Sequence, residues 1–546
     1  MSRLSVPPNF IGTSSADTIV GEELNAPLAI GIEILSKGLI DTGSGKDTIQ
    51  GTGNGTNGFD GFDGDGGNGG TGTGIANSGN LNTEKENDNI IGTGNGGNGG
   101  SIGNNIFSKS GTSGSGTGIA NSASLNTGSG NDTLTGTGNG GDAGNDYANP
   151  VYGGSGTGIN NSGTINTGSG KDTIAGTGNG GNSGVFGGSG TGINNTKELD
   201  TQDGEDTITG IGTGGSDGES DGTGTGINNS GSLNTGSGED TITGTGNGGT
   251  GTGINNSGSI NTGLGKDTIA GTGNGGYSGV FGGSGTGINN TKELDTQDGE
   301  DTITGIGTGG SGGNSDFGSY GGTGTGINNS GSINTGSGND TITGTGNGGK
   351  INSSPGSTGA GTGIQNIKNA AITTGSDKDT IIGYGNSLGE NATAYGIFND
   401  GLIDTGDSCD KLTGQATTTI GGTAYGIYGE GTINTGDGND EITATSIIGG
   451  VQQKVSIGGD IKIDLATGND YLKGFGNATV DGGKGFDTLD LGAFNRSELL
   501  VSGVISGNPL NSANFSFNGI SLSTTGFEKF IFADSSLDYS TLVNGA

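Results

Sequence analysis

Residues 226–244 read GINNSGSLNTGSGEDTITG, and the same pattern recurs along most of the chain. Its first isoleucine and its aspartate, Ile227 and Asp240 in this copy, are 13 positions apart in ten copies: Ile75/Asp88, Ile119/Asp132, Ile159/Asp172, Ile193/Asp206, Ile227/Asp240, Ile254/Asp267, Ile288/Asp301, Ile327/Asp340, Ile397/Asp410 and Ile427/Asp440. Two further copies, Ile32/Asp47 and Ile364/Asp379, have a spacing of 15. The segments between copies vary from 14 to 31 residues. A constant block joined by variable segments is typical of a solenoid with one coil per repeat.

Alternation within the block predicts short strands with one buried face. Ile227, Leu233 and Ile242 are expected to point inward, and the glycine pair Gly236/Gly238 is expected to turn the chain. We therefore predict an all-β, right-handed parallel β-solenoid, with one three-sided coil per repeat of 27–44 residues. The conserved spacing also predicts a buried ladder of amide side chains, formed by Asn77, Asn121, Asn161, Asn195, Asn229, Asn256, Asn290, Asn329, Asn366 and Asn399.

Composition limits the function. Glycine supplies 137 of 546 residues and apolar residues only 25%, so a non-repetitive chain of this kind would be disordered. The net charge of −36 disfavours nucleic acid and anionic membranes and attracts cations. No stretch approaches the roughly 20 apolar residues of a membrane span. Histidine is absent and Cys409 is the single cysteine, which argues against zinc sites, disulfides within the chain and most acid–base catalysis. We expect a protein that is not an enzyme.

The glycine turn before each aspartate carries the candidate chemistry. Residues 127–132 read TGSGND, and residues 482–490 read GGKGFDTLD. These turns resemble the Gly-Gly-x-Gly-x-Asp-x-U-x nonapeptide, with U an aliphatic residue, of the RTX (repeats-in-toxin, haemolysin-type) calcium-binding proteins. The resemblance implies bound Ca²⁺ at the turns, with these candidate ligand positions: Asp132, Asp203, Asp206, Asp240, Asp298, Asp301, Asp340, Asp407, Asp410, Asp437, Asp440, Gly468, Asp470, Gly482, Gly483, Gly485, Asp487 and Asp490.

Physical chemistry supports this expectation, and the chain also departs from the family pattern. Calcium takes six to eight oxygen ligands, and a glycine turn followed by an aspartate offers carbonyls and a carboxylate. However, each long repeat has one such turn where the family has two, and a lysine precedes the aspartate at Lys46, Lys171, Lys266 and Lys378. The alternative is that the aspartate only hydrogen-bonds within its turn, without metal.

The ends of the chain differ from its middle. We expect an N-terminal cap at residues 1–27, the glycine-rich solenoid at 28–448, and an RTX-like roll with an apolar cap at 449–546. The first residues, MSRLSVPP, lack the apolar core of a cleaved signal peptide. The last 60 residues resemble the C-terminal region of RTX proteins, which implies an uncleaved signal for secretion to the cell surface or beyond.

The leading hypothesis is a secreted or cell-surface structural rod stiffened by calcium, with cell-surface polysaccharide or like solenoids as further partners. An alternative is an adhesin or an ice- or carbohydrate-binding solenoid that uses outward Thr-x-Thr pairs: Thr133/Thr135, Thr207/Thr209, Thr241/Thr243, Thr302/Thr304 and Thr341/Thr343. Ala175 and Ala270 interrupt this array. A polysaccharide-modifying β-helix enzyme is a third alternative, but the 19 Lys and Arg residues are scattered thinly.

Overall fold

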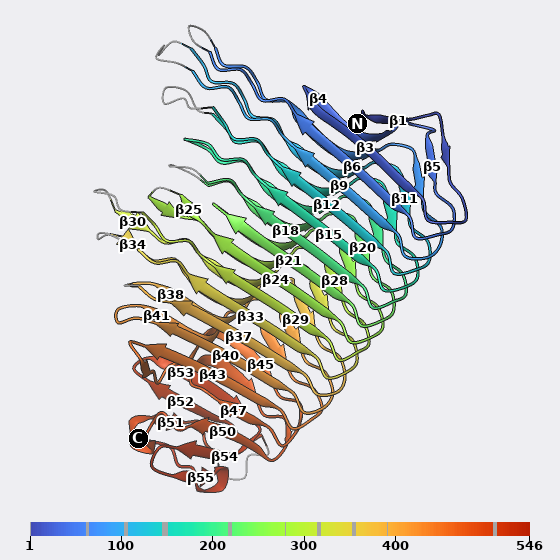
Figure 1. Cartoon of the computed structure of the whole chain (residues 1–546). Coiled ribbons are helices and arrows are strands. Elements are labelled where there is room, and N and C mark those ends of the chain that lie inside the picture. The colour runs from blue at the N-terminus through green and yellow to red at the C-terminus, as the bar shows by residue number, and fades with distance from the viewer. Residues whose placement is uncertain are drawn as a thin grey trace.

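The chain folds into one long parallel β-solenoid whose coils stack from the N-terminus to the C-terminus (Figure 1). The computed structural model describes residues 2–61, 65–102, 108–144, 151–216, 221–278, 280–313, 318–351, 356–389, 391–505 and 510–546. These residues contain no α-helix, only two single-turn 3-10 helices, η1 (Arg496–Glu498) and η2 (Tyr539–Thr541). The predicted parallel β-solenoid is confirmed.

One coil consists of three strands, as β19 (Gly224–Asn229), β20 (Ser232–Asn234) and β21 (Thr241–Gly248) show. The next coil repeats them as β22 (Gly251–Asn256), β23 (Ser259–Asn261) and β24 (Thr268–Gly275). All three pairings are parallel, and their registers align Ile227 with Ile254, Leu233 with Ile260 and Ile242 with Ile269. The repeat found in the sequence is therefore the structural coil.

The remaining strands of the stack fall into the same three series. The first series continues β19 and β22 with β4 (Leu28–Ile34), β7 (Thr71–Asn77), β10 (Gly116–Asn121), β13 (Gly156–Asn161), β16 (Gly190–Asn195), β27 (Gly285–Asn290), β31 (Gly324–Asn329), β35 (Gly361–Asn366), β38 (Thr393–Asn399) and β41 (Thr423–Tyr428). The second holds β5 (Leu39–Asp41), β8 (Asn80–Asn82), β11 (Ser124–Asn126), β14 (Thr164–Asn166), β17 (Glu198–Asp200), β28 (Glu293–Asp295), β32 (Ser332–Asn334), β36 (Ala371–Thr373), β39 (Leu402–Asp404) and β42 (Thr432–Asn434). The third holds β6 (Thr48–Gly55), β9 (Asn89–Asn95), β12 (Thr133–Asn139), β15 (Thr173–Asn179), β18 (Thr207–Thr213), β29 (Thr302–Thr308), β33 (Thr341–Gly348), β37 (Thr380–Ser387), β40 (Lys411–Thr418) and β43 (Glu441–Ile448).

The core is a stack of aliphatic side chains beside a ladder of amides. Ile227, Leu233 and Ile242 are completely buried, as are their equivalents in the other coils, so the predicted orientation is confirmed. Asn229 Nδ2 donates to Asn256 Oδ1 at 2.9 Å and to the Ser259 carbonyl at 2.9 Å. The same amide–amide bond joins all ten predicted asparagines, from Asn77 to Asn399. The amide ladder is therefore confirmed.

In most coils the two long sides converge until their backbones touch, and in the last coils alanines such as Ala416 and Ala444 replace the glycines between them. A Cβ atom added to Gly244 on β21 would lie 2.3 Å from the carbonyl oxygen of Gly253 on β22. One added to Gly226 on β19 would lie 2.2 Å from the Thr245 nitrogen. No side chain fits between these strands, which explains why glycine alternates with threonine and asparagine at this end of each strand.

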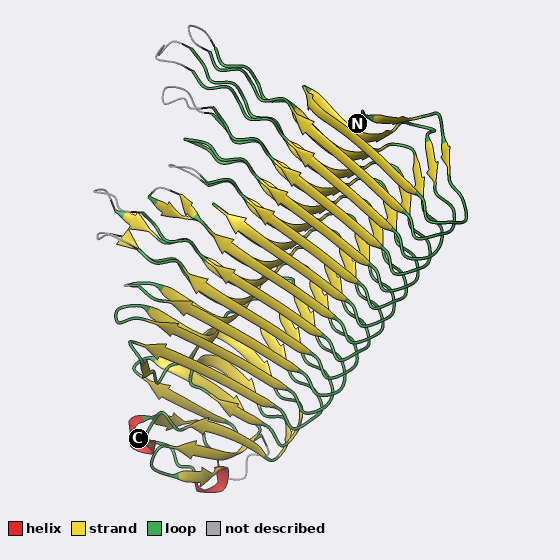
Figure 2. Ribbon diagram, in the orientation of Figure 1, coloured by secondary structure: helices red, strands yellow, loops and turns green. Residues whose placement is uncertain are grey.

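Beyond this narrow edge the glycine-rich segments continue as long arms (Figure 2). Their hydrogen bonds repeat every three residues: the N–H groups of Gly66, Gly69 and Gly72 donate to the carbonyls of Lys109, Thr112 and Ser115 in the next coil. A second set connects the outgoing and returning halves of the arms, as from Gly97 to Gly70 and from Gly100 to Gly67. A period of three is that of extended chains in polyproline II geometry. The variable segments between copies of the repeat thus form these arms, whereas several tips, such as 145–150, lie outside the described residues.

The first coil begins almost at the N-terminus. Its strands β1 (Leu4–Val6), β2 (Phe10–Ile11) and β3 (Thr18–Ala26) pair in parallel with β4, β5 and β6. Four short strands, β25 (Tyr277–Ser278), β26 (Phe281–Gly282), β30 (Ser319–Tyr320) and β34 (Gly356–Ser357), lie in the arms.

At the other end the stack continues past residue 448 into a β cap. The continuation consists of β44 (Val451–Gln452), β45 (Ile457–Asp464), β46 (Thr467–Gly468), β47 (Tyr471–Lys473), β48 (Gly476–Asp481), β49 (Lys484–Gly485) and β50 (Asp487–Leu491). The cap consists of β51 (Leu500–Ser502), β52 (Ala513–Phe517), β53 (Ile520–Thr525), β54 (Phe527–Phe532) and β55 (Ser536–Asp538), with antiparallel pairing of β51 to β52, β52 to β53 and β54 to β55. Its core is aromatic, with Phe475, Phe494, Phe515, Phe527 and Phe530 fully buried. The predicted C-terminal β cap is thus present.

Candidate functional site

The candidate turn is shaped by two residues in left-handed backbone conformations, which are glycines in most coils, although Gln202 takes the place of Gly236 in the preceding coil with a φ angle of +63°. Gly236 and Gly238 have φ angles of +87° and +152°. A Cβ atom at these positions would lie 1.7 Å from the Gln202 carbonyl oxygen and 1.4 Å from that of Gly204, both in the preceding coil. The turns therefore stack backbone against backbone and present their carbonyl groups along the rod.

The aspartate that follows each turn joins a continuous hydrogen-bonded column. The N–H of Asp240 donates to Oδ1 of Asp267 in the next coil at 2.9 Å, and the other links measure 2.7–2.8 Å. We call this set the Asp column; its members are Asp17, Asp47, Asp88, Asp132, Asp172, Asp206, Asp240, Asp267, Asp301, Asp340, Asp379, Asp410, Asp440, Asp470 and Asp487. From Asp47 onward each member is at most 2% exposed.

The other carboxyl oxygen of each column member, Oδ2, lies in a different environment from Oδ1. From Asp47 to Asp487 every Oδ2 atom is buried and has no hydrogen-bond partner of ordinary geometry among the described residues. A buried polar atom without a partner costs free energy, and a buried charge costs more. The Asp column therefore needs a proton or a cation to be stable inside the rod.

Burial raises the pKa of these carboxyl groups, which favours their protonated form. Desolvation is the largest cause, and the charges of neighbouring column members add to it in several coils. The N–H donated along the column and a nearby threonine hydroxyl, such as that of Thr201 for Asp206, act in the opposite direction. The net effect raises the pKa to about 7 for Asp88, Asp172, Asp267, Asp379 and Asp470, and to about 6 for Asp206, Asp301, Asp340, Asp410, Asp440 and Asp487. The pKa values of Asp132 and Asp240 are raised as well.

The acids proposed as second ligands of the turns lie on the outside. Asp203, Asp298, Asp407 and Asp437 are exposed, whereas their partners Asp206, Asp301, Asp410 and Asp440 are buried. Asp437 Oδ1 accepts a hydrogen bond from the Thr467 hydroxyl at 2.6 Å. The structure therefore places the two acids of each pair in different environments and does not gather them around one point.

The lysines beside the column also point outward. Lys171 Nζ lies 3.1 Å from Glu205 Oε2, and Lys266 Nζ lies 3.4 Å from Glu300 Oε2, with all four side chains well exposed. These ion pairs join neighbouring coils at the surface, where such pairs contribute little. Neither lysine neutralises the buried aspartate that follows it in the sequence.

The C-terminal turns have the same backbone geometry as the turns of the repeats, but different residues follow them. Gly468, Gly483 and Gly485 have φ angles of +155°, +84° and +142°. Gly482 precedes this turn, and its N–H donates to the Thr525 carbonyl at 2.8 Å. Asp490 is already engaged, because its carboxylate accepts hydrogen bonds from the Tyr471 hydroxyl and the Gly492 N–H.

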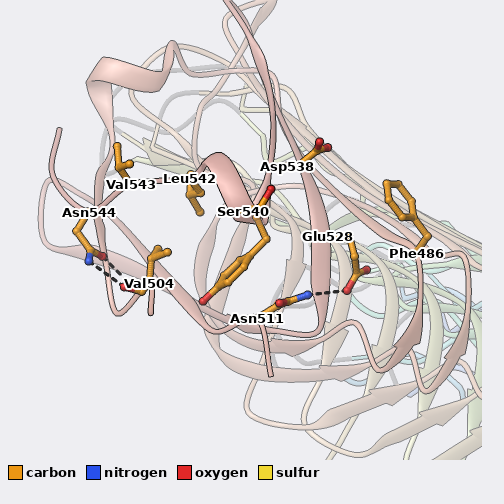
Figure 3. Close-up of a pocket in the computed structure, with 10 residues that line it drawn as sticks. Phe486, Val504, Asn511, Glu528, Asp538, Ser540, Leu542, Val543 and Asn544 are labelled. Carbon is orange, nitrogen blue, oxygen red and sulfur yellow. Dashed lines mark hydrogen bonds between the residues drawn. The ribbon is translucent and has the colours of Figure 1, made fainter. Parts of the chain in front are cut away.

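The column ends on a residue that sequence reasoning missed. The N–H of Asp487 donates to Glu528 Oε2 at 2.7 Å, and Glu528 Oε1 accepts from Asn511 Nδ2 at 2.7 Å (Figure 3). Glu528 also lines a cavity of about 670 Å³ with Phe486, Asp538 and Asn544. The register of β50 against β54, which aligns Asp487 with Phe527, explains why a longer acidic side chain one residue later takes over the role of the aspartate.

No protein-family model matches the chain, and no curated protein matches it either. Among the described residues there is no group of three or more Asp, Glu, His or Cys side chains placed to hold a metal ion. A cation at the Asp column would therefore take most of its oxygens from backbone carbonyls. In the same part of the chain, no helix is long and apolar enough to cross a membrane.

Proposed function

We propose that this chain is a secreted or cell-surface structural protein, a solenoid rod in which calcium neutralises the Asp column. The single observation that supports this function best is the line of buried Oδ2 atoms without partners from Asp47 to Asp487. A net charge of −36 adds to the need for cations. A role of this kind requires length and rigidity, and it requires no catalytic group.

The oxygens on the inner side of the turns match the chemistry of calcium. Calcium takes six to eight oxygens at about 2.3–2.6 Å and accepts both carboxylates and carbonyls. Each coil offers one column carboxylate and the carbonyls of a glycine turn such as Gly236–Gly238. A cation would be most favourable near Asp487. The negative charges of Glu528 and Asp481 help to raise the pKa of Asp487, and a cation would offset this repulsion. There the Asp487 carboxylate would supply an oxygen to the ion and backbone carbonyls of the turn would supply most of the others, because no three acids among the described residues are placed together to hold a metal.

Calcium removal tests the proposal. The purified protein is melted in excess chelator and in millimolar calcium at about pH 7.5, above the folded pKa of about 6 to 7 of most column members, so that most of their carboxyl groups are ionised. Calcium is expected to raise the melting temperature, since a ligand that binds only the folded state adds about 2.7 kcal/mol per site at a hundredfold excess over its dissociation constant. Asp470→Asn and Asp487→Asn should reduce this increase, whereas Asp203→Asn, on the surface, should not. Equal melting temperatures with and without calcium would leave a metal-free structural rod.

A second candidate function rests on the outer face of the third strand series. There Thr241 and Thr243 align with Thr207 and Thr209 of the preceding coil, so that the pairs form two parallel columns. In the coil before, Ala175 takes the place of Thr209. Ile211 and Ile306 on the same face are 38% and 37% exposed. A flat array of threonines is suited to ice or to carbohydrate, and a measurement of thermal hysteresis with Thr243→Lys as the variant tests the ice-binding form.

A further inference from the structure

Two coils near the C-terminal cap carry aromatic side chains on a face that is otherwise polar. Tyr395 aligns with Thr362 of the preceding coil and with Tyr425 of the next. Phe398 aligns in the same way with Gln365 and with Tyr428. In earlier coils these outward positions hold Thr and Asn, as at Thr225 and Asn228. The four rings lie on β38 and β41 and are half-buried.

The four rings form one continuous layer, which we call the aromatic platform (Tyr395, Phe398, Tyr425 and Tyr428). The Tyr395 and Tyr425 rings are 6.3 Å apart and inclined by 11°, and those of Phe398 and Tyr428 are 5.7 Å apart and inclined by 28°. Tyr428 also lies 5.1 Å from Tyr395 and 5.0 Å from Tyr425. Tyr395 and Phe398 thus support the rings of Tyr425 and Tyr428, which line the hollows beside the platform.

The rings of Tyr425 and Tyr428 pack closely on the backbone of the next coil. The position that follows Tyr428 in the next coil is Gly458, where a Cβ atom would lie 2.9 Å from Tyr428 Cδ2 and 3.0 Å from Tyr425 Cε1. Beyond this glycine, Val455 and Ile520 of the cap region form the far wall of a groove. Its two adjoining hollows, which share Tyr425, measure about 380 Å³ and 290 Å³.

Polar groups line one end of this groove. Glu430, Asp460 and Asn477 border the smaller hollow, and all three are exposed. Apolar ring faces beside a few hydrogen-bonding groups at the rim are the usual composition of a ligand site. Four half-buried aromatic rings beside a groove, on a strand series that holds mostly Thr and Asn at these positions in earlier coils, indicate a binding surface.

We propose that the aromatic platform binds a neutral saccharide chain. A pyranose ring has an apolar C–H face that can pack on an aromatic ring and a rim of hydroxyl groups that can donate to carboxylates such as Glu430 and Asp460. The net charge of −36 and the two rim carboxylates oppose anionic sugars, so the ligand is an uncharged glycan. This site goes beyond the structural role proposed above and does not depend on the Asp column.

Calorimetric titration with cellohexaose, mannohexaose and chitohexaose tests the proposal, with an oligogalacturonate as the anionic comparison. All titrations are run in millimolar calcium, so that the state of the Asp column is constant. At least one neutral chain should bind and the oligogalacturonate should not. Tyr425→Ala and Tyr428→Ala should each weaken binding by about tenfold or more, as expected for the loss of a ring contact. Tyr425→Phe should bind within a few-fold of the wild type, because it keeps the ring face.

The matched control is Tyr320→Ala in the arms. Tyr320 stacks on Phe281 at 5.1 Å and is 41% exposed, but it lines neither hollow of the groove. Its removal should leave binding unchanged, and circular dichroism checks that every variant remains folded. The proposal is overturned if no neutral chain binds at millimolar concentration, or if binding survives both alanine variants of the platform unchanged.

Discussion

The backbone N–H of Asp240 donates a hydrogen bond to the side chain of Asp267, the residue that occupies the same place one coil later. The acceptor is Oδ1, while Oδ2 of the same carboxyl group is buried and has no hydrogen bond of ordinary geometry, with the Thr262 hydroxyl nearby. From Asp47 onward, each member of the Asp column thus accepts from one neighbour through Oδ1 and leaves Oδ2 to be neutralised. The first two predictions follow from this arrangement.

Without metal, the rod should become less stable as the pH rises. The pKa of Asp88, Asp172 and Asp267 is about 7 in the folded state, against about 3.9 in an unfolded chain. Below the unfolded value both states are protonated, and between the two values the folded state binds more protons, so stability falls across this window. Urea unfolding in chelator at about pH 4.5, 6 and 7.5 measures it. A constant or rising free energy of unfolding would contradict it.

Neutralising one column member should act in opposite directions with and without calcium. Asp172→Asn keeps an oxygen for the Asp132 N–H and removes a buried charge. In chelator at about pH 7.5, Asp172→Asn should leave the free energy of unfolding unchanged or increase it by about 1–3 kcal/mol. In calcium, the same variant should reduce the stabilisation that the bound ion provides. Asp203→Asn is the exposed control and should change neither value. A loss of stability for Asp172→Asn in chelator would show that the ionised carboxylate is favourable.

The amide ladder should matter more than the similar row of amides on the surface. Asn229→Ala removes a buried amide and leaves the Nδ2 of Asn195 and the Oδ1 of Asn256 without their partners, which should cost about 1–3 kcal/mol or more. Asn228→Ala is the matched control, because Asn228 bonds Asn194 and Asn255 in the same way but is only half-buried. Thermal melting compares the two, and equal losses would count against a special role of the buried ladder.

The narrow edge of the coil at Gly244 should tolerate no side chain, in contrast to the last coils, where Ala444 takes this position. Gly244→Ala would place a methyl group 2.3 Å from the carbonyl oxygen of Gly253 on the facing strand, so we expect a loss of at least about 1–3 kcal/mol from overpacking. Gly184→Ala, in an arm where nothing lies within 4 Å of the added atom, should be neutral. Denaturant titration distinguishes them, and a neutral Gly244→Ala would mean that the two long sides can separate.

Much of the coil could be predicted because the constant 13-residue spacing and the alternation at Ile227, Asn229 and Leu233 each have one structural solution. The strands within residues 4–26 could not be predicted from the repeat, because Asp17-Thr18-Ile19 does not follow a glycine turn like the one before Asp47. The period of three in the arms lies in a glycine-rich background, where spacing carries little information. Glu528 could not be found at all, since it joins the column through cap pairing that no repeat specifies.

The parallel register has a mechanical consequence. The hydrogen bonds between coils run along the rod, so a pull on its two ends loads the coils in series, and the weakest coil opens first. The coil from Asp240 to Asp267 holds 27 residues, and the one from Asp88 to Asp132 holds 44. Drawn out at about 3.4 Å per residue, a single coil releases roughly 90–150 Å of chain, where it occupied about 5 Å of rod. Under tension the molecule is therefore an extensible tether that lengthens in steps, each set by the size of one repeat.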